Sequence, residues 1–480
     1  MSLSHAINAA RTGLQVTGLR ADMVATNVSN ATTPGYVRRS VLVSEITTST
    51  NPAGVQADGV GRSTNDALTA QRMASGSDLA QASVLASSWA SLSARLGDSV
   101  DGSGLFAMMS DFQSALSNAA ATPESQANLN AVVDSVKALA SEFRSLSQFV
   151  SSERVDADRE IASGVATVND ALAQVEALNV KLAGIDRTSA RAAALMDERQ
   201  RYVDTISEFL PVDTVKRQGG AIDIVTKEGV FLLAGSASQI EFSPASAVGP
   251  GDSIESGALS GMSVGGVDIT PGQPSYGAVS SGLFGALFAL RDADLPAFNE
   301  QLDTVAGDLL SRLDGADTDG MGANTSLLID TNPGSPTGLA GRLAINPLID
   351  PLQGGQLSRL RDGLDATTPG DAGNGRLFNS MLDALQANRT LSAGGFEGSY
   401  NASNLIAGFA TRTGQMRISS EAVEASTAAQ HSIMAEAERR ETGVDVDTQM
   451  QMLLEIEQAY AANARVIEIA NQMMLKLMEL

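Results

Sequence analysis

Few residues of this chain have the types and spacing that enzymatic chemistry requires. Gly261, Ser263 and Gly265 match the G-x-S-x-G pattern, in which a serine on a sharp strand-to-helix turn acts as a nucleophile. Glycine, proline and turn signals follow Ser263 where a helix is required, and the only downstream histidine, His431, lies in a polar helical stretch. The context therefore favours a loop at Ser263 and leaves a secreted serine hydrolase as a distant alternative.

The sequence gives equally little support for a metal or cofactor site. Asp317, Asp319 and Gly320 resemble the middle of a calcium loop, but this alignment places Gly315 first and Ser326 twelfth, where oxygen ligands are essential. The chain has no cysteine and two histidines, which excludes disulfides, thiol nucleophiles and cysteine zinc sites. We therefore predict a protein without catalytic residues, cofactor or metal.

Length and charge narrow the class of protein further. A single core stops growing near ~250 to 300 residues, so 480 residues predict two or three units. The net charge of -23 opposes nucleic-acid binding, because phosphates are bound through an excess of lysine and arginine. No apolar run approaches the ~20 residues of a membrane helix, and residues 1 to 30 lack a leader pattern. We expect no membrane insertion, and export only by a route that reads no cleaved leader.

Both ends of the chain carry the apolar spacing of packed helices. The N-terminal residues step by three and four from Leu3, as in a coiled-coil seam, and a helix should end near Asn30 because Pro34 and Gly35 form a turn. The seam consists of Leu3, Ile7, Ala10, Leu14, Thr17, Ala21, Val24 and Val28.

The C-terminal stretch has the broader apolar stripe. Its seam consists of Met452, Ile456, Ala459, Asn463, Val466, Ala470, Met473, Leu477 and Leu480, and beside it lie Leu453, Tyr460, Ile467 and Met474. A helix over residues 445 to 480 would be about 54 Å long. Because this helix is too long for one compact domain to cover, we expect the two ends to pack on each other and on neighbouring copies.

Between the ends, the period of the apolar pattern changes twice. Residues 65 to 210 are helical in pattern, and Thr122 with Pro123 predicts the start of a seam that extends to Val175. Two long antiparallel helices or one very long helix would both satisfy this spacing. At Pro211 the period falls to two, which predicts a strand meander. Helical spacing resumes near Leu283, a loop-rich segment covers 314 to 375, and helices return from Leu377.

We predict a mainly α fold with terminal coiled-coil helices, a long-helix bundle and a small all-β insert. Residues 1–60 with 435–480 should form the terminal coiled-coil segment and an extended linker, residues 61–210 with 283–434 a helical middle domain, and residues 211–282 an inserted β domain.

Two terminal motifs resemble the signatures of the bacterial flagellar axial proteins, which include rod, hook and hook-associated proteins. The first is NVSNATTPGYVRR at residues 27–39, preceded by ARTGL, and the second is TGVDVDTQMQMLLEIEQAYAANARVIEIANQMM at residues 442–474. Segments 103–125, 194–212 and 282–306 are similar to the hook-associated members at the hook–filament junction. The chain departs from the family pattern at Thr12, where serine is usual, and at Thr448 and Gln449, where an acidic pair is usual.

This resemblance implies a structural role on the flagellum and no enzymatic activity. It implies that the terminal helices line the inside of the flagellar tube, in a ring-like layer of identical copies between the hook protein and a neighbouring junction protein. It also implies unfolded type III export from the cytoplasm, with an export chaperone on the C-terminal helix. A hook or rod protein is the alternative. The expected assembly residues combine positions of both helices with five residues of the first motif. They are Leu3, Ile7, Leu14, Val24, Val28, Asn27, Asn30, Pro34, Gly35, Tyr36, Met452, Ile456, Tyr460, Asn463, Val466, Ile467, Ala470, Met473 and Leu477.

Overall fold

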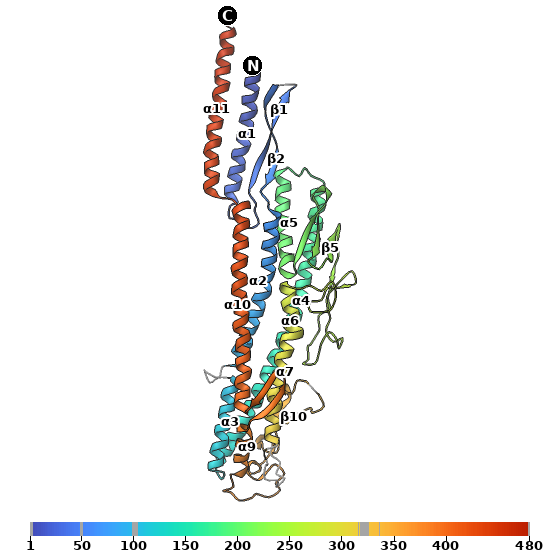
Figure 1. Ribbon diagram of the computed structural model, residues 1–480, viewed down its shortest axis with the longest axis vertical. Coiled ribbons are helices and arrows are strands. Elements are labelled where there is room, and N and C mark those ends of the chain that lie inside the picture. The colour runs from blue at the N-terminus through green and yellow to red at the C-terminus, as the bar shows by residue number, and fades with distance from the viewer. Residues whose placement is uncertain are drawn as a thin grey trace.

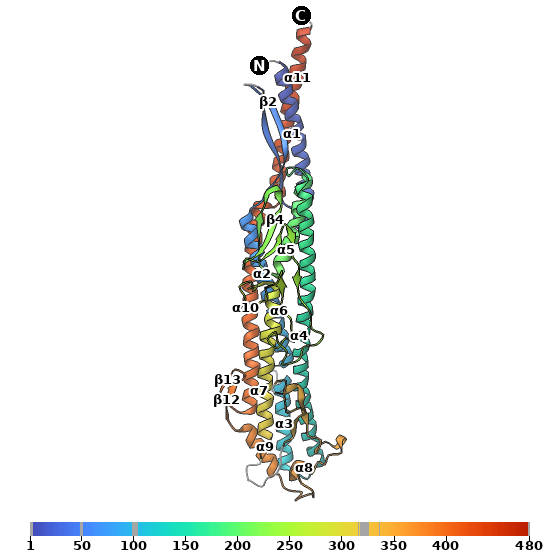
Figure 2. The same ribbon diagram turned by 90° about the vertical axis from the view of Figure 1, so that its right-hand side faces the viewer.

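The computed structural model describes residues 3–48, 51–97, 104–314, 316, 326–335 and 337–478. The molecule is a long rod with both termini at one end, as Figures 1 and 2 show. The α-helices are α1 (Leu3–Ser29), α2 (Asp66–Leu96), α3 (Gly104–Ala121), α4 (Gln126–Ala183), α5 (Ala190–Phe209), α6 (Gly282–Ala289), α7 (Leu295–Asp314), α8 (Arg359–Asp362), α9 (Arg376–Gln386), α10 (Ala402–Thr442) and α11 (Val446–Met478). A π-helical turn, Leu290–Asp294, joins α6 to α7.

All of the described strand pairs are antiparallel. The strands are β1 (Arg39–Thr48), β2 (Asn51–Arg62), β3 (Val212–Lys216), β4 (Ile222–Thr226), β5 (Phe231–Ala234), β6 (Ser236–Ala237), β7 (Ile240–Glu241), β8 (Ser263–Val264), β9 (Val267–Asp268), β10 (Leu328–Asp330), β11 (Leu343–Ile345), β12 (Arg389–Ala393) and β13 (Phe396–Tyr400). The sheet orders are β1-β2, β3-β4-β5-β6, β7-β8-β9, β10-β11 and β12-β13. Within the described residues, short 3₁₀ turns occur at Gln218–Gly220, Ala340–Arg342 and Pro351–Gln353.

One helix of 58 residues, α4, accounts for the long seam of the middle region. Its apolar positions from Leu129 to Val175 are buried, which confirms the spacing and selects the single long helix over two antiparallel ones. The expected start at Thr122 is wrong by three residues. Pro123 and Glu124 form a turn, and the hydroxyl of Ser125 caps α4 by accepting a hydrogen bond from the Asn128 N–H.

Buried apolar residues gather in two clusters, and α4 contributes to both of them. The first half of α4 packs in one cluster with residues of α3, α7, α9 and the start of α10. The second half packs with residues of α5, α6 and the strands β3 to β8. The strands that follow Pro211 therefore share a core with the helices beside them. The mainly α fold with a small β part is confirmed.

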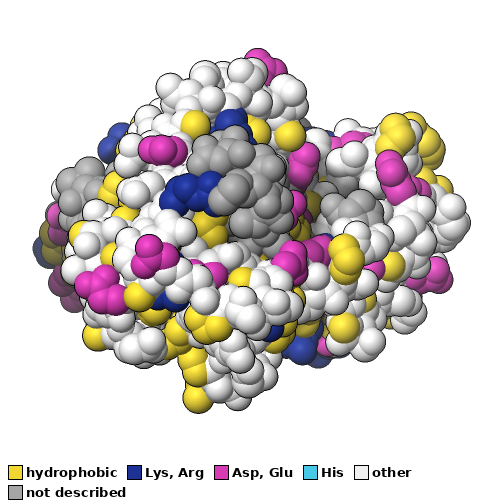
Figure 3. All heavy atoms as spheres, turned by 90° about the horizontal axis from the view of Figure 1, so that it is seen from below, with side chains coloured by type: hydrophobic (Ala, Val, Ile, Leu, Met, Phe, Trp, Pro, Cys, Tyr) yellow, Lys and Arg dark blue, Asp and Glu magenta, His cyan; other side chains and the backbone are white. Residues whose placement is uncertain are grey.

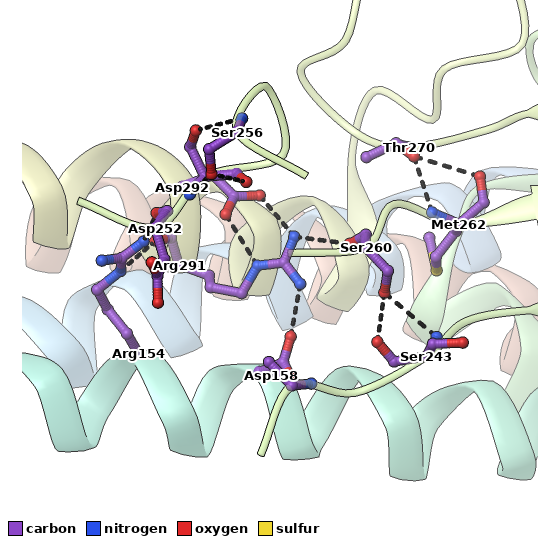
Figure 4. A network of polar contacts seen from close by, with 12 residues as sticks. Arg154, Asp158, Ser243, Asp252, Ser256, Ser260, Met262, Thr270, Arg291 and Asp292 are labelled. Atoms are coloured by element: carbon purple, nitrogen blue, oxygen red, sulfur yellow. Dashed lines mark hydrogen bonds and ion pairs between the residues drawn. The ribbon is translucent and has the colours of Figure 1, made fainter. Parts of the chain in front are cut away.

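A buried ionic network fixes the irregular chain after β7 to α4 (Figure 4). Arg291, in the π-helical turn, is fully buried, and its Nη1 donates to Asp158 Oδ1 of α4 over 2.6 Å. Arg154 donates to three backbone carbonyl oxygens, those of Arg291, Gly249 and Asp252. Within the polar stretch that interrupts the α4 seam between Val150 and Ile161, Arg154 and Asp158 are thus buried and paired.

Two further expectations require correction, and a third falls outside the described residues. The helical region after Leu377 is interrupted by the β12–β13 hairpin, which the glycine pair Gly394 and Gly395 turns with positive φ angles of 59° and 74°. Ser263 begins strand β8 and does not lie in a loop. The calcium-like turn at Asp317–Gly320 lies outside the described residues.

Candidate assembly interface

The terminal helices α1 and α11 run side by side in opposite directions (Figure 1). Two contacts define their register: Gly13 lies against Asn463, and Asn27 bonds to Gln449. The two contacts are separated by 27 − 13 = 14 residues on α1 and 463 − 449 = 14 residues on α11, which is two heptads. The pair is therefore an antiparallel two-helix coil with one consistent register over these heptads.

The structure buries part of the expected seam. On α1, Val24 is buried, and Leu3, Ile7, Leu14 and Val28 are partly buried. On α11, Ala470 is buried, and Ile456, Asn463 and Ile467 are partly buried. Five expected assembly residues are instead 42% to 66% exposed: Met452, Tyr460, Val466, Met473 and Leu477. One partner helix covers only one side of the broad α11 stripe.

The uncovered side of α11 is extensive. Leu454, Ile469 and Leu475 are 59%, 47% and 58% exposed, although no seam expectation included them. Large exposed apolar side chains in such a row are unusual on a monomeric surface and mark contact surfaces. At the opposite end of the rod, apolar side chains are interspersed with acidic ones (Figure 3). We call the exposed apolar side chains of α11 between Met450 and Met478 the α11 face.

The β1–β2 hairpin lies along α1 at a close distance. A Cβ atom on Gly54 would lie 2.3 Å from Thr12 Oγ1, so only glycine allows this approach, and its φ of 135° also favours glycine. The Thr12 hydroxyl accepts a hydrogen bond from the Val55 N–H over 3.3 Å. Threonine at position 12 thus still supplies a hydroxyl to the hairpin, as the usual serine would.

Asn27 is the centre of the junction between the terminal pair and the rod. It is 1% exposed, and its Nδ2 donates to Arg39 O over 2.8 Å and to Gln449 Oε1 over 2.9 Å. Its Oδ1 accepts from the Tyr36 hydroxyl over 2.8 Å and from the Arg39 N–H over 3.0 Å. One amide therefore joins α1, the first residue of β1 and α11.

An ionic cluster continues this junction into the helical body. Asp197 of α5 is 7% exposed and binds Arg39 Nη2 over 2.8 Å through Oδ2 and Arg62 Nε over 2.8 Å through Oδ1. The Arg39 guanidinium lies 4.7 Å from the centre of the Tyr36 ring, a cation–π distance. Burial raises the pKa of the Tyr36 phenol, which keeps it protonated as the donor to Asn27.

Backbone contacts attach α10 to the same junction between the terminal pair and the rod. The Arg38 N–H donates to Thr442 O over 2.8 Å, and the Ser63 hydroxyl donates to Glu441 O over 3.1 Å. These contacts lie where α10 ends, next to the Gly443–Asp445 break before α11. The expected boundary at residue 435 falls inside α10, seven residues before its end at Thr442. We call the contacts of Asn27, Tyr36, Arg38, Arg39, Ser63, Arg62, Asp197, Thr442 and Gln449 the joint.

The other motif residues shape the turn that leads into the joint. Gly35 has a φ of 75°, and a Cβ atom there would lie 2.9 Å from Arg201 Cγ. Asn30 donates through Nδ2 to Thr26 O, and Pro34 is exposed. Gln449 was not expected as a site residue, although its departure from the family pattern marked it. Its burial depends on Asn27, which lies 422 positions away, and no local pattern reveals that contact.

The geometry gives no support to the hydrolase alternative. Ser263 Oγ lies 3.5 Å from Glu241 Oε2, whereas the His431 ring nitrogen lies 3.2 Å from Ser75 Oγ on α2. Within the part of the chain that the structure describes, no group of three or more histidine or acidic side chains is placed to hold a metal ion. No described helix combines the length and the apolar character needed to cross a membrane.

Comparisons with known proteins agree with the terminal motifs. A family model described as "Flagellar hook-associated protein FlgK helical domain" matches residues 90–330, and one described as "Flagellar basal body rod FlgEFG protein C-terminal" matches residues 440–480. The chain is 26% identical over 258 residues to flagellar hook-associated protein 1 of Salmonella typhimurium, covering 51% of this chain and 45% of that protein. It is 22% identical over 239 residues to the protein of that name from Bacillus subtilis, covering 47% of each.

A solved structure, that of the flagellar hook junction protein FlgK from Burkholderia pseudomallei, matches with 19% identity and a TM-score of 0.43, covering 54% of this chain and 46% of that one. The chain spans about half the length of the curated relatives that it matches. The helical-domain model alone covers half of the 480 residues, and it includes all three interior segments on which the resemblance rests. The chain therefore belongs to the flagellar hook-associated protein FlgK family.

Proposed function

We propose that this chain is a structural subunit of the bacterial flagellum that forms the junction between hook and filament and works by packing, without catalysis. The observation that carries the proposal is the α11 face, a row of large apolar side chains that the chain itself leaves uncovered. The family and the names of its relatives support the same role.

Burial of the α11 face supplies the driving force for assembly. Each large apolar side chain that is fully removed from water contributes about 1.5 to 3 kcal/mol. Copies of this chain in a ring-like layer would cover the face with the terminal helices of their neighbours. The joint fixes the direction of the terminal pair relative to the rod, because Asn27 and Asp197 bond across that boundary.

The proposed partners are those that the family suggests for such a surface. They are copies of this chain, the hook protein below, a neighbouring junction protein above and an export chaperone on α11 before assembly. The proposed location is the hook–filament junction, reached from the cytoplasm by type III export. We also propose that residues 1–60 with 435–480 act as the assembly segment, while residues 61–210 with 283–434 carry the 211–282 strands outward.

The test is a charge placed on the α11 face. Val466 is 43% exposed, so Val466→Asp should leave the isolated chain folded. In the assembled layer the same charge would be buried without a partner, which costs several kcal/mol in every subunit. Gln458→Asp adds the same charge at an exposed polar position of α11 and serves as the control.

In a strain that lacks the native gene, cells with Val466→Asp should carry bare hooks and shed filament protein into the medium. Cells with Gln458→Asp should swim. Swimming Val466→Asp cells, with circular dichroism confirming a folded protein, would contradict the proposal. Loss of the hooks themselves would favour the hook or rod alternative, which the name of the C-terminal family model raises.

A further inference from the structure

A cavity of about 580 Å³ lies beside the joint, where β2, α2, α5, the β3–β4 turn and α10 meet. This volume is within the range of small-molecule sites. Five cationic side chains line it: Arg62, Arg187, Arg199, Lys216 and Arg217. In a chain with a net charge of -23, such a concentration of cations opposes the average charge of the surface.

The acidic side chains of the cavity do not neutralise all of these cations. Asp66 is paired with Lys216, Asp213 with Lys227, and Glu438 with Arg72, which lies outside the cavity wall. Arg62 is held by Asp197, and Arg217 by Asp223. Arg187 and Arg199 form no ion pair with any residue that the structure describes. Neither guanidinium therefore lies within ion-pair distance of a described carboxylate. Asp186, next to Arg187 in the chain, attracts it electrostatically but accepts its hydrogen bonds from Thr188.

Arg199 is the more constrained of the two. Its Nη1 donates to Asn179 Oδ1 over 2.9 Å and to Gly220 O over 2.7 Å, both neutral acceptors. Burial, with a smaller effect from the neighbouring Arg62, lowers the pKa of Arg199 to about 10. A guanidinium in this environment gains from an oxyanion, because a charge-assisted hydrogen bond offsets the loss of hydration.

The turn between β3 and β4 brings the second guanidinium to the same cavity. Gly220 has a φ of 83°, and a Cβ atom there would lie 3.1 Å from Cδ of Arg187. The exposed Arg187 thus packs its stem on the same glycine whose carbonyl oxygen accepts from Arg199. Gly220 is the shared contact of both unpaired cations.

We propose that this cavity binds an oxyanion, a carboxylate or phosphate group, between Arg187 and Arg199. The bound anion would connect the α4–α5 loop to α5 and the β3–β4 turn. Arg199 lies two residues from Asp197, so occupancy would hold the part of α5 on which the joint depends. The anion is either a free small molecule or an acidic side chain of a second copy of this chain.

The experiment titrates the full chain with inorganic phosphate, and separately with succinate, at constant ionic strength. Isothermal titration calorimetry should show saturable binding, and thermal unfolding should shift upward with the anion concentration. Arg187→Gln and Arg199→Gln should each weaken binding at least about tenfold, the effect of losing one charge-assisted hydrogen bond. Arg191→Gln, an exposed cation on α5 outside the cavity, should leave binding unchanged.

Sedimentation with and without phosphate distinguishes the two sources of the anion. Self-association that phosphate and Arg187→Gln both weaken assigns the site to a carboxylate of a second copy. Phosphate binding without any change in association assigns it to a free anion. Because Arg187 is exposed, Arg187→Gln should fold even if Arg199→Gln does not. Unsaturable binding, or equal affinity in the wild type and Arg187→Gln, overturns the proposal.

Discussion

Asn27 uses the full hydrogen-bonding capacity of its amide. Both Nδ2 hydrogens and both lone pairs of Oδ1 have partners, and these belong to residues 36–39 and to Gln449. Few other side chains could replace it, since an aspartate has no donors and a leucine has neither donors nor acceptors. The asparagine in the N-terminal motif is thus explained by the joint, a structural role that requires no chemistry.

Asn27→Leu should destabilise the α1–α11 pair. The substitution keeps the size of the side chain but leaves the four groups that bond to Asn27 without this hydrogen-bond partner. Each unsatisfied buried group costs about 1 to 3 kcal/mol, so we expect a loss of roughly 3 kcal/mol or more. Hydrogen exchange of the α1 and α11 amides measures this loss of stability. Asn8→Leu, at an exposed position of α1, is the control, and equal effects of the two changes would refute the role of Asn27.

Acid should weaken the start of α11 through Asp445. Its Oδ1 accepts from the N–H groups of Thr448 and Asp447, and the hydrogen bond from Thr448 is the main cause of its lowered pKa. A carboxyl whose folded pKa is depressed stabilises the fold above its unfolded pKa of about 3.9 and loses that contribution as the pH falls through the folded value. As the pH falls below about 3.9, amide exchange at Asp447 and Thr448 should accelerate after correction for intrinsic rates. In Asp445→Asn, the corrected exchange rate should not depend on pH over the same interval.

At the scale of elements, the two glycines of α1 have different surroundings. A Cβ atom on Gly13 would lie 2.9 Å from Asn463 Nδ2, whereas one on Gly18 would meet nothing within 4 Å. Gly13 therefore serves the approach of α11, and Gly18 only weakens the helix. The spacing of apolar residues predicts both helices, but it cannot reveal which glycine is in contact.

Gly18→Ala should stabilise α1 by about 1 kcal/mol, the difference in helix propensity. Gly13→Ala has the same intrinsic gain, but the Asn463 side chain must move, so we expect a smaller gain or a loss. Amide exchange of α1 in the two variants gives the comparison. If both changes stabilise α1 equally, the register of the α1–α11 pair is wrong.

At the scale of the whole molecule, the sequence predicts the elements that local spacing determines. It does not predict contacts between residues that lie far apart in the chain. The seam of α4 and the meander from Val212 to Ala234 were predictable, because period and turn residues are local. The contacts of Asp158 with Arg291 and of Asn27 with Gln449 were not, because their partners lie 133 and 422 positions away. The α11 stripe was predicted to be broad, but which of its positions α1 covers depends on the register.

Deletion of residues 213–281, closed by a short glycine linker, tests whether the strands are a separate unit. Ile224 and Leu233 are fully buried in the same cluster as α4 and α5, so their removal uncovers apolar helix surface. We expect a lower melting temperature and a broader transition by differential scanning calorimetry. An unchanged helical transition would show that 211–282 is an inserted domain with its own core.

The contact between Asn27 and Gln449 has a consequence for the order of folding. Closing an unstructured loop of 422 positions costs conformational entropy on the order of 5 kcal/mol, which exceeds the net gain of about 1 kcal/mol from a typical hydrogen bond. Folding of the rod brings Arg38 to Thr442 and shortens the loop that this contact must close, so we expect the Asn27–Gln449 hydrogen bond to form after the rod. In that order of events, the surface that we propose to join one molecule to the next is the last to be completed.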